Sequence, residues 1–517
     1  MASVTISRIR NAACRIISSI PFPIIVIAGA TVYCLGIALH GLMFFSVLGL
    51  TVFAITLIYY CAIDLSFLCR YFRLFFASIA NLAGVVCCEF FSIKLSELGG
   101  IQTHFVGSIP ALSFAWWIVF LIFWYESCQS HKNFSLKEKS NTREESEIQY
   151  ICTNKKISPQ AHDEVSSPQQ KNCDSTVITW YRHLDAIVGS VLFPIAYLVV
   201  FSAVFLQVID HPAFLLNVDR FTYAKMYPLG IFSKLMLYVY YSLPVLVTQI
   251  FQNRHRMLCI SAIVVSILTY LWLGNKFLVF LNLLVSICFA ICIWWEKNKN
   301  ISMMKRYASR IFIVFLLLVA CAVFIQMALG SNSTSGEYFF KRTAEQGQIW
   351  WKVYGLQEDS MPHSNEFGRE LDVWFSPTDE SEQEKDYGIY KMMLVTTPKE
   401  IVSAKLAAGS TYTEAGFACS YYYGGYVGLI IFSILMGSLL AILTRVLIRR
   451  LSDNRAIEAF LIFRLYTIAI TAIGMFTSFH ELFSPISLLS AVFLFVLDKI
   501  FKHVYTKEKY GRVDSSR

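Results

Sequence analysis

About a dozen long apolar runs constrain the fold of this chain more than any other feature. A helix needs about 20 mostly apolar residues to cross the hydrocarbon core of a membrane. The runs are continuous and lack the polar alternation of barrel strands, so they predict helices. They lie at 17–40, 42–64, 71–93, 105–125, 186–208, 230–251, 257–273, 277–295, 311–330, 426–448, 459–479 and 482–501.

The composition excludes a soluble protein. Of the 517 residues 56% are hydrophobic and only 15% are charged, and the mean hydropathy is +0.54. The sequence therefore predicts an all-α, polytopic integral membrane protein with about 12 transmembrane helices. Two pairs of runs, around His40 and around Lys276, are closely spaced. If either pair is one re-entrant or tilted element, every later loop changes sides.

Charge predicts the orientation of these helices. If the N-terminus is inside, most basic residues near helix ends fall on the cytoplasmic side, as the positive-inside rule requires. Those assigned inside are Arg8, Arg10, Arg15, Arg70, Arg73, Arg254, Arg256, Lys297, Lys299, Lys305, Arg306, Arg310, Arg445, Arg449, Arg450 and Arg455 and the tail from Lys499; those in the short outer loops are Lys94, Arg220, Lys225 and Lys276. We expect both termini in the cytoplasm. The net charge of +9 follows from this bias and indicates contact with membrane lipid, with no nucleic-acid partner.

Two polar segments divide the chain. The predicted parts are helices 1–4 in 1–126, a cytoplasmic loop at 127–185, helices 5–9 in 186–330, a large extracytoplasmic loop at 331–425, helices 10–12 in 426–502 and a basic cytoplasmic tail at 503–517. The first apolar run follows three arginines, as in a signal peptide, but it is long and lacks a small-residue cleavage pattern. We interpret it as an uncleaved first helix.

Cysteine and histidine usage predicts neither a disulfide in the outer loop nor a metal site. Of the 14 Cys, only Cys419 falls in the large outer loop, so no internal disulfide can form there. His363 and His480 have no nearby ligand set in the sequence. We expect no metal and no cofactor.

Cations and aromatic residues interleave in the predicted outer loops. Arg220 and Tyr223 lie in one loop, Lys276 in a second, and Arg342, Gln346 and Trp350 at the start of the large loop. Arg and Lys suit phosphate oxygens, and aromatic faces stack on sugar rings. The alternatives are that Arg220 anchors at lipid headgroups and that Trp350 belongs to an interfacial aromatic belt.

The large loop ends in a second polar and glycine-rich group. Glu414 places a carboxylate at the predicted membrane surface, and Gly424 and Gly425 allow backbone and ligand to approach closely. The alternative is a helix-entry turn whose small residues serve helix packing.

These features together resemble the bacterial Wzy-type polymerases of O-antigen and capsule repeat units. The resemblance rests on Asp219-Arg220-Phe221-Thr222-Tyr223, on Gly274-Asn275-Lys276, on Arg342 with Gln346-Gly347, and on Glu414 followed by a Gly-x-x-Gly entry into a helix. It covers helices five to ten. Relatives often carry Gly-x-Arg where this chain has Lys276, and lysine cannot bind phosphate bidentately.

The resemblance implies a metal-independent membrane glycosyltransferase in the bacterial cytoplasmic membrane. Such an enzyme transfers a growing glycan from undecaprenyl pyrophosphate to the terminal sugar of a lipid-linked repeat unit, alongside a flippase and a chain-length regulator. We expect Arg220, Lys276 and Arg342 to stabilise the departing pyrophosphate, with Tyr223, Gln346, Trp350, Gly424 and Gly425 in the substrate site. For the base we expect Glu414 first and His480 second.

Three other functions remain open at the level of sequence. A non-enzymatic scaffold with an extracellular sensor loop is favoured only if the large outer loop folds independently. A ligase that attaches finished glycan would share the outer loop, the cations and the lipid carrier. A flippase or other transporter suits about a dozen helices equally, but transporters usually show internal repeats and short outer loops.

Overall fold

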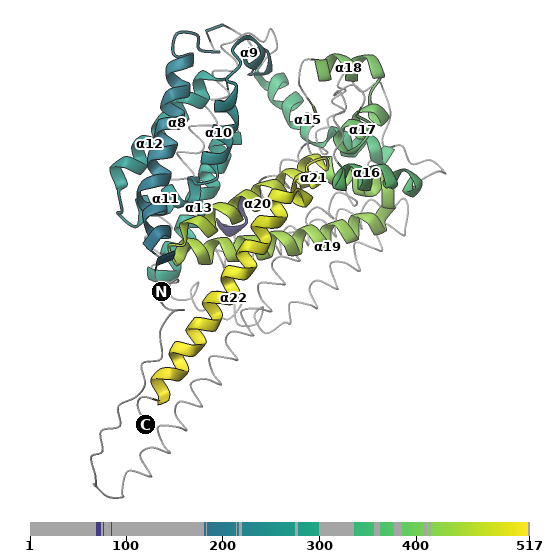
Figure 1. The fold of residues 1–517 in the computed structure, drawn as a ribbon. Helices are drawn as coiled ribbons and strands as arrows, with labels where there is room; N and C mark the ends of the chain where they lie inside the picture. The colour runs from purple at the N-terminus through teal and green to yellow at the C-terminus, as the bar shows by residue number, and fades with distance from the viewer. Residues whose placement is uncertain are drawn as a thin grey trace, which may run out of the picture.

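The computed structural model describes residues 69–73, 76, 84, 180–181, 183–213, 215–216, 220–274, 278–298, 335–355, 362–376, 385–407, 411–412 and 415–514. The regular elements in these residues are helices, and none of them is a strand, so the all-α class is confirmed for this part (Figure 1). Within it three helices are long and apolar enough to cross a membrane, or four if one bent pair forms a single span. The predicted spans at 17–40, 42–64, 105–125 and 311–330 lie outside the described residues, and the total of about 12 stays a prediction.

One bundle is built from the helices that follow residue 183. It contains a π-helical stretch at Val188–Leu192 and the helices α8 (Phe193–Val208), α10 (Ile231–Tyr240), α11 (Leu243–Phe251) and α12 (Arg256–Trp272). α8 packs beside both α10 and α12 (Figure 1). Tyr197, Phe201 and Leu246 are fully buried at its centre. The short helix α9 (Arg220–Met226) lies at one end of this bundle.

The run at 230–251, predicted as one span, is broken near its middle. α10 and α11 meet at an angle of 43°. Pro244 lies in the first turn of α11, where its missing N–H cannot continue the hydrogen-bond ladder of α10. A hydropathy pattern records only that both halves are apolar, so it does not reveal this break.

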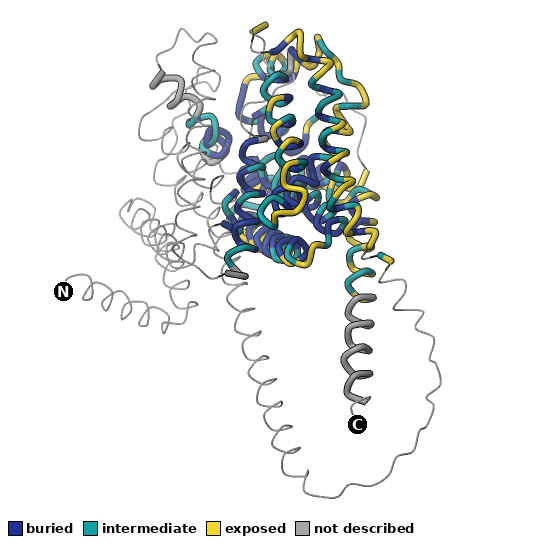
Figure 2. The backbone as a smooth tube through the Cα atoms, turned by 90° about the vertical axis from the view of Figure 1, so that its left-hand side faces the viewer, coloured by how far each residue is buried: buried dark blue, intermediate teal, exposed yellow. Residues whose placement is uncertain are grey.

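A second group of helices forms around a long hairpin. α19 (Gly416–Ser452) and α20 (Ala456–Met475) lie side by side, and α13 (Leu278–Asn298), α21 (Phe479–Phe483) and α22 (Pro485–Asp514) complete the group. Figure 2 shows the buried residues concentrated in the middle of the described part. The part of α19 after the non-helical Gly425 is about 40 Å long at about 1.5 Å per residue, which exceeds the hydrocarbon core of a membrane of about 30 Å.

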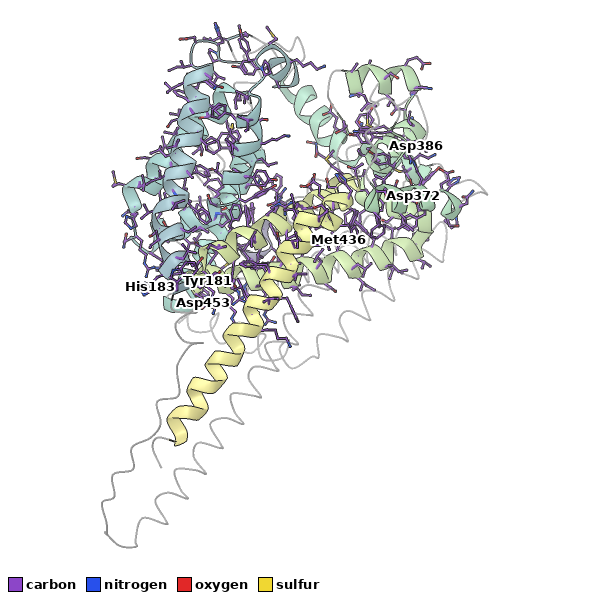
Figure 3. All side chains as sticks on the ribbon, in the orientation of Figure 1. Tyr181, His183, Asp372, Asp386, Met436 and Asp453 are labelled. Carbon is purple, nitrogen blue, oxygen red and sulfur yellow. The ribbon has the colours of Figure 1, made fainter. Side chains whose placement is uncertain are left out.

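Buried ion pairs close one end of the hairpin. Arg450 near the end of α19 lies 2.8 Å from a carboxylate oxygen of Glu458 in α20 and 2.8 Å from Asp498 in α22. Arg455 adds a contact of 3.4 Å to Glu458. Asp185, which precedes α8, accepts hydrogen bonds from the N–H groups of residues 456 and 457 at 3.0 and 2.7 Å. Four segments are therefore joined at this end, which the labels of Tyr181 and Asp453 mark in Figure 3.

Replacing Arg450 should destabilise the protein much more than replacing its neighbour. Only 6% of the Arg450 side chain is exposed, against 69% of Arg449. Arg450→Leu leaves the buried Glu458 without its nearest cation, and we expect a loss of about 3–5 kcal/mol in the free energy of unfolding. Arg449→Leu should cost less than about 1 kcal/mol. Denaturant unfolding in a mild detergent compares the two; equal losses would contradict the role given to the buried pair.

Polar residues of the predicted outer loop form helices that dock on the other end of the hairpin. They are α15 (Ser335–Gly355), a 3-10 turn at Ser364–Glu366, α16 (Phe367–Phe375), α17 (Gly388–Thr396) and α18 (Lys399–Ala407). α15 and α17 pack on α19, and α16 packs on α21 (Figure 1). The Lys225 ammonium of α9 donates to the carbonyl of Ala407 at 2.6 Å, which ties this group to the first bundle.

A glycine kink separates two parts of α19. The sequence predicted that the loop would end at Gly425 and the span begin at Tyr426. The structure has a helical stretch from Gly416 up to the non-helical Gly425, and the part of α19 beyond the kink begins where the span was predicted. Gly425 has φ 56° and ψ −148°, a conformation essentially restricted to glycine. Tyr421, Tyr422 and Tyr423 before the kink are buried. Burial of these rings accounts for helix where turn residues had predicted a loop.

The adjacent glycines give a matched test of this kink. A Cβ atom at either Gly424 or Gly425 would meet nothing within 4 Å, so neither substitution creates a clash. In Gly425→Ala the alanine has to adopt a backbone conformation that is unfavourable for any residue with a Cβ atom. We expect a loss of about 1–3 kcal/mol in the free energy of unfolding. Gly424→Ala keeps a helical backbone and should be neutral or stabilising by up to about 1 kcal/mol. Thermal unfolding in lipid nanodiscs checks the order; if both variants lose the same stability, the kink is not the cause.

Candidate functional site

Ionisable side chains gather where α16 and α17 meet the first turns of α19. The group contains Glu366, Glu370, Lys391, Tyr422 and Tyr423, and we call it the carboxylate site. Glu366 and Glu370 are one helical turn apart, so the 3-10 turn and α16 present both to α19. Lys391 comes from α17, and the two tyrosines precede the kink at Gly425.

Glu366 is the accessible member of the carboxylate site. Its side chain is 34% exposed, and one oxygen lies 2.7 Å from the Lys391 ammonium. The Tyr422 hydroxyl donates to it at 3.3 Å, and Nδ1 of His363 lies 3.6 Å away. The hydrogen bond from Lys391 is the main reason that the pKa of Glu366 is lowered below its usual value. Glu366 is therefore ionised at neutral pH.

An aromatic pair closes one side of Glu366. The His363 ring stacks on the Tyr422 ring with centroids 4.4 Å apart and planes inclined by 20°. The His363 N–H also donates to the Tyr422 carbonyl at 3.0 Å. These two contacts hold the turn that carries Glu366 against α19. His363 keeps 26% of its side chain exposed beside Glu366, whereas the Tyr422 ring is buried.

Glu370 is the buried member. Its side chain has no exposed surface, and one oxygen accepts hydrogen bonds from the Tyr423 hydroxyl at 2.6 Å and from the N–H of Gly388. The other oxygen has no hydrogen-bond partner among the described residues. Because burial disfavours a carboxylate that is only half satisfied, the pKa of Glu370 is raised.

The pKa values of the two carboxyl groups are thus shifted in opposite directions. The hydrogen bond from Lys391 lowers the pKa of Glu366, whereas burial raises the pKa of Glu370. Neighbouring carboxyl groups with divergent pKa values are a recurrent arrangement in acid and base catalysis. Only Glu366 is open to a ligand, so Glu370 acts as a support that fixes α16 on Tyr423 and on α17.

The residues predicted from sequence are distributed over several helices. His480 lies in α21, half-buried, with Nδ1 2.6 Å from the Thr477 carbonyl oxygen. Trp350 of α15 is buried and packs edge-to-face on Tyr421, with centroids 5.7 Å apart. Tyr223 of α9 is buried in the first bundle and donates to the carbonyl of His211 at 2.8 Å. Trp350 therefore lies next to the carboxylate site's helix α19, and Tyr223 belongs to another core.

The remaining predicted residues are only partly described. Gln346 is half-buried on α15, one turn before Trp350, and Gly424 and Gly425 lie in α19 directly after Tyr423. The structure describes the backbone of Arg220 and Arg342 but not their side chains, and Glu414 and Lys276 lie outside the described residues. Convergence of the three predicted cations therefore stays a prediction.

Sequence reasoning missed both glutamates of the carboxylate site. Their signal was present: Glu366 and Glu370 are spaced by one helical turn, beside apolar residues at helical spacing in Phe367, Val373 and Trp374. His363 was noted only as a metal ligand without partners. No group of three or more His, Cys, Asp or Glu side chains in the described part of the chain could hold a metal ion.

Comparison with known proteins gives one match, which covers part of the site. Residues 382–490 match a family of unknown function (DUF6418). The matched range includes Lys391, Tyr422, Tyr423 and His480 and excludes Glu366 and Glu370. No curated protein and no solved structure matches the chain.

The raised pKa of Glu370 predicts a pH-dependent difference between wild type and Glu370→Gln. As pH rises above the ordinary value of 4.5, the unfolded chain ionises at this position while the folded chain stays neutral. Wild type therefore loses stability until pH passes the raised pKa, by up to about 1.4 kcal/mol per unit. Glu370→Gln has no carboxyl group to ionise at this position and loses no stability in this way. We therefore expect the stability of this variant relative to wild type to increase with pH.

Thermal unfolding between pH 4 and pH 8, in detergent, measures this difference. Glu400→Gln, the same change on the exposed side of α18, controls for the loss of one carboxylate. A constant difference between wild type and Glu370→Gln across this range would contradict a raised pKa of Glu370 in the folded protein.

Proposed function

We propose that the protein is a membrane glycosyltransferase that polymerises oligosaccharide repeat units carried on undecaprenyl pyrophosphate. The observation that carries this proposal is the half-exposed Glu366, paired with Lys391 and flanked by stacked rings, at the end of a long apolar helix. The resemblance to Wzy-type polymerases supports the same reading. The proposal places the protein in the bacterial cytoplasmic membrane with the carboxylate site on its outer face.

Location favours a lipid-linked substrate. The carboxylate site adjoins the first turns of α19, a helix long and apolar enough to span a membrane. A pyrophosphate attached to a membrane lipid is held at the headgroup level, and its sugars extend from there. A site where polar helices dock on the end of a membrane-spanning hairpin meets this geometry.

Glycosyl transfer needs a group that orients and deprotonates the acceptor hydroxyl. In the proposed reaction the hydroxyl oxygen of the acceptor sugar attacks the anomeric carbon of the growing glycan. The bond from that carbon to the pyrophosphate oxygen breaks, and polyprenyl pyrophosphate leaves with the bonding electrons. Glu366 accepts the hydroxyl proton, because it is ionised and exposed. Glu414 and His480 remain the bases predicted from sequence.

Positive charge is needed where the pyrophosphate departs. Lys391 lies 2.7 Å from Glu366 and lowers its pKa. Arg220, Lys276 and Arg342 are proposed to neutralise the pyrophosphate itself. His363, which is 26% exposed and stacks on the buried Tyr422 ring, supplies the flat surface for the acceptor sugar.

Variants at Glu366 and Lys391 test this function. In cells lacking the chromosomal gene, Glu366→Gln should abolish long-chain glycan while single-repeat product persists, with unchanged protein in the membrane fraction. Glu400→Gln on α18 should restore the full ladder of chain lengths. Lys391→Met removes the hydrogen bond that lowers the pKa of Glu366, so the acid limb of the transfer rate should move to higher pH.

The product pattern separates the proposed activity from its rivals. Loss of polymer with retained single-repeat product identifies a polymerase. Intact polymer that stays on the lipid carrier would indicate a ligase instead, and loss of every outer-face product would indicate a flippase. A normal ladder from Glu366→Gln would show that this carboxylate is not the base.

A further inference from the structure

α16 carries an apolar surface that no other described helix covers. Leu371 and Phe375, one turn apart, are 38% and 66% exposed. The opposite side of the same helix is buried through Glu370 and Val373. The exposed polar side holds Asp372, labelled in Figure 3. α16 therefore has a buried side, an exposed polar side and an exposed apolar edge.

This apolar edge continues onto α21. The Phe375 ring lies 4.9 Å from the Phe483 ring, centroid to centroid, and Phe483 is itself 37% exposed. Trp374 packs on Phe479 at 4.7 Å and on Phe483 at 6.1 Å. The aromatic contacts fix the edge of α16 to α21, so the two helices present one surface.

The same surface then runs into α22. This helix begins at Pro485, two residues after Phe483. Its first turns expose a set of large apolar side chains: Ile486, Leu488, Leu489, Val492, Phe493, Phe495 and Val496. Such a helix is expected to face hydrocarbon, because apolar side chains on several of its sides would be costly in water. Phe483 of α21 and then Phe375 of α16 continue the exposed apolar surface of α22, so lipid in contact with α22 would also contact these two rings.

We propose that α16 lies along the membrane surface and inserts Leu371 and Phe375 among lipid chains, as the edge of the lipid-facing surface of α21 and α22. The polar side of α16 suits headgroups and water: Asp372 is exposed, and Arg369 pairs with Asp386 at 3.1 Å. A helix with an apolar edge and a charged side is typical of interfacial membrane binding. This arrangement would hold Glu366 and Glu370 at headgroup level, and it does not depend on the proposed chemistry.

Photocrosslinking of the full-length protein tests the proposal. The photoreactive amino acid p-benzoylphenylalanine is placed at position 375 in one variant and at position 372 in another. Both are reconstituted in vesicles of phosphatidylethanolamine and phosphatidylglycerol and irradiated. Both positions are exposed on the same short helix, so neither replacement removes a buried contact. The same label at position 489 in α22 provides a reference for lipid contact.

We expect lipid adducts at positions 375 and 489 and none above the unirradiated background at position 372. Adducts between protein chains at position 375 would overturn the proposal in favour of a protein interface. Absence of a lipid adduct at position 375, or equal adducts at positions 372 and 375, would also overturn it.

Discussion

The close packing of α19 against α20 is the constraint on which the rest of the described structure depends. At one end a Cβ on Gly416 would clash with the carbonyl oxygen of Ile473, and the N–H of Ala415 donates to the Gly474 carbonyl at 2.6 Å. At the other end Arg450 and Glu458 form a buried ion pair. Removing one partner of such a pair exposes the full desolvation cost of the other. The hairpin is thereby fixed at both ends.

The hairpin positions both the ion pairs around Arg450 and the carboxylate site. Asp185 and Asp498 come from segments far apart in sequence, yet both meet the end that holds Arg450. The opposite end receives α15, α16 and α17, and there Tyr422 and Tyr423 bind the two glutamates. The polar segment that contains α15, α16 and α17 therefore packs on the hairpin as a group of helices. Its ionisable residues Glu366 and Glu370 lie where it meets α19.

Sequence reasoning was strongest where one local property dominates. Continuous apolar runs predicted helices at 186–208, 257–273, 277–295 and 459–479, and the structure has helices in each of these regions. It was weakest at Gly425, where glycine and tyrosine residues suggested a loop. There a helical stretch from Gly416 precedes the kink, because three tyrosine rings are buried against neighbouring helices. Turn propensity cannot register burial against segments distant in the chain.

By itself the sequence determined the helical class of the described part and the apolar character of its spans. These follow from hydropathy and from backbone sterics, which are local. Only the tertiary structure decided which ionisable residues matter. Glu366 and Glu370 look alike in the sequence, but the hydrogen bond from Lys391 lowers the pKa of one and burial raises the pKa of the other. Desolvation and charge pairing depend on neighbours brought together by folding, so no reading of the linear chain separates the two.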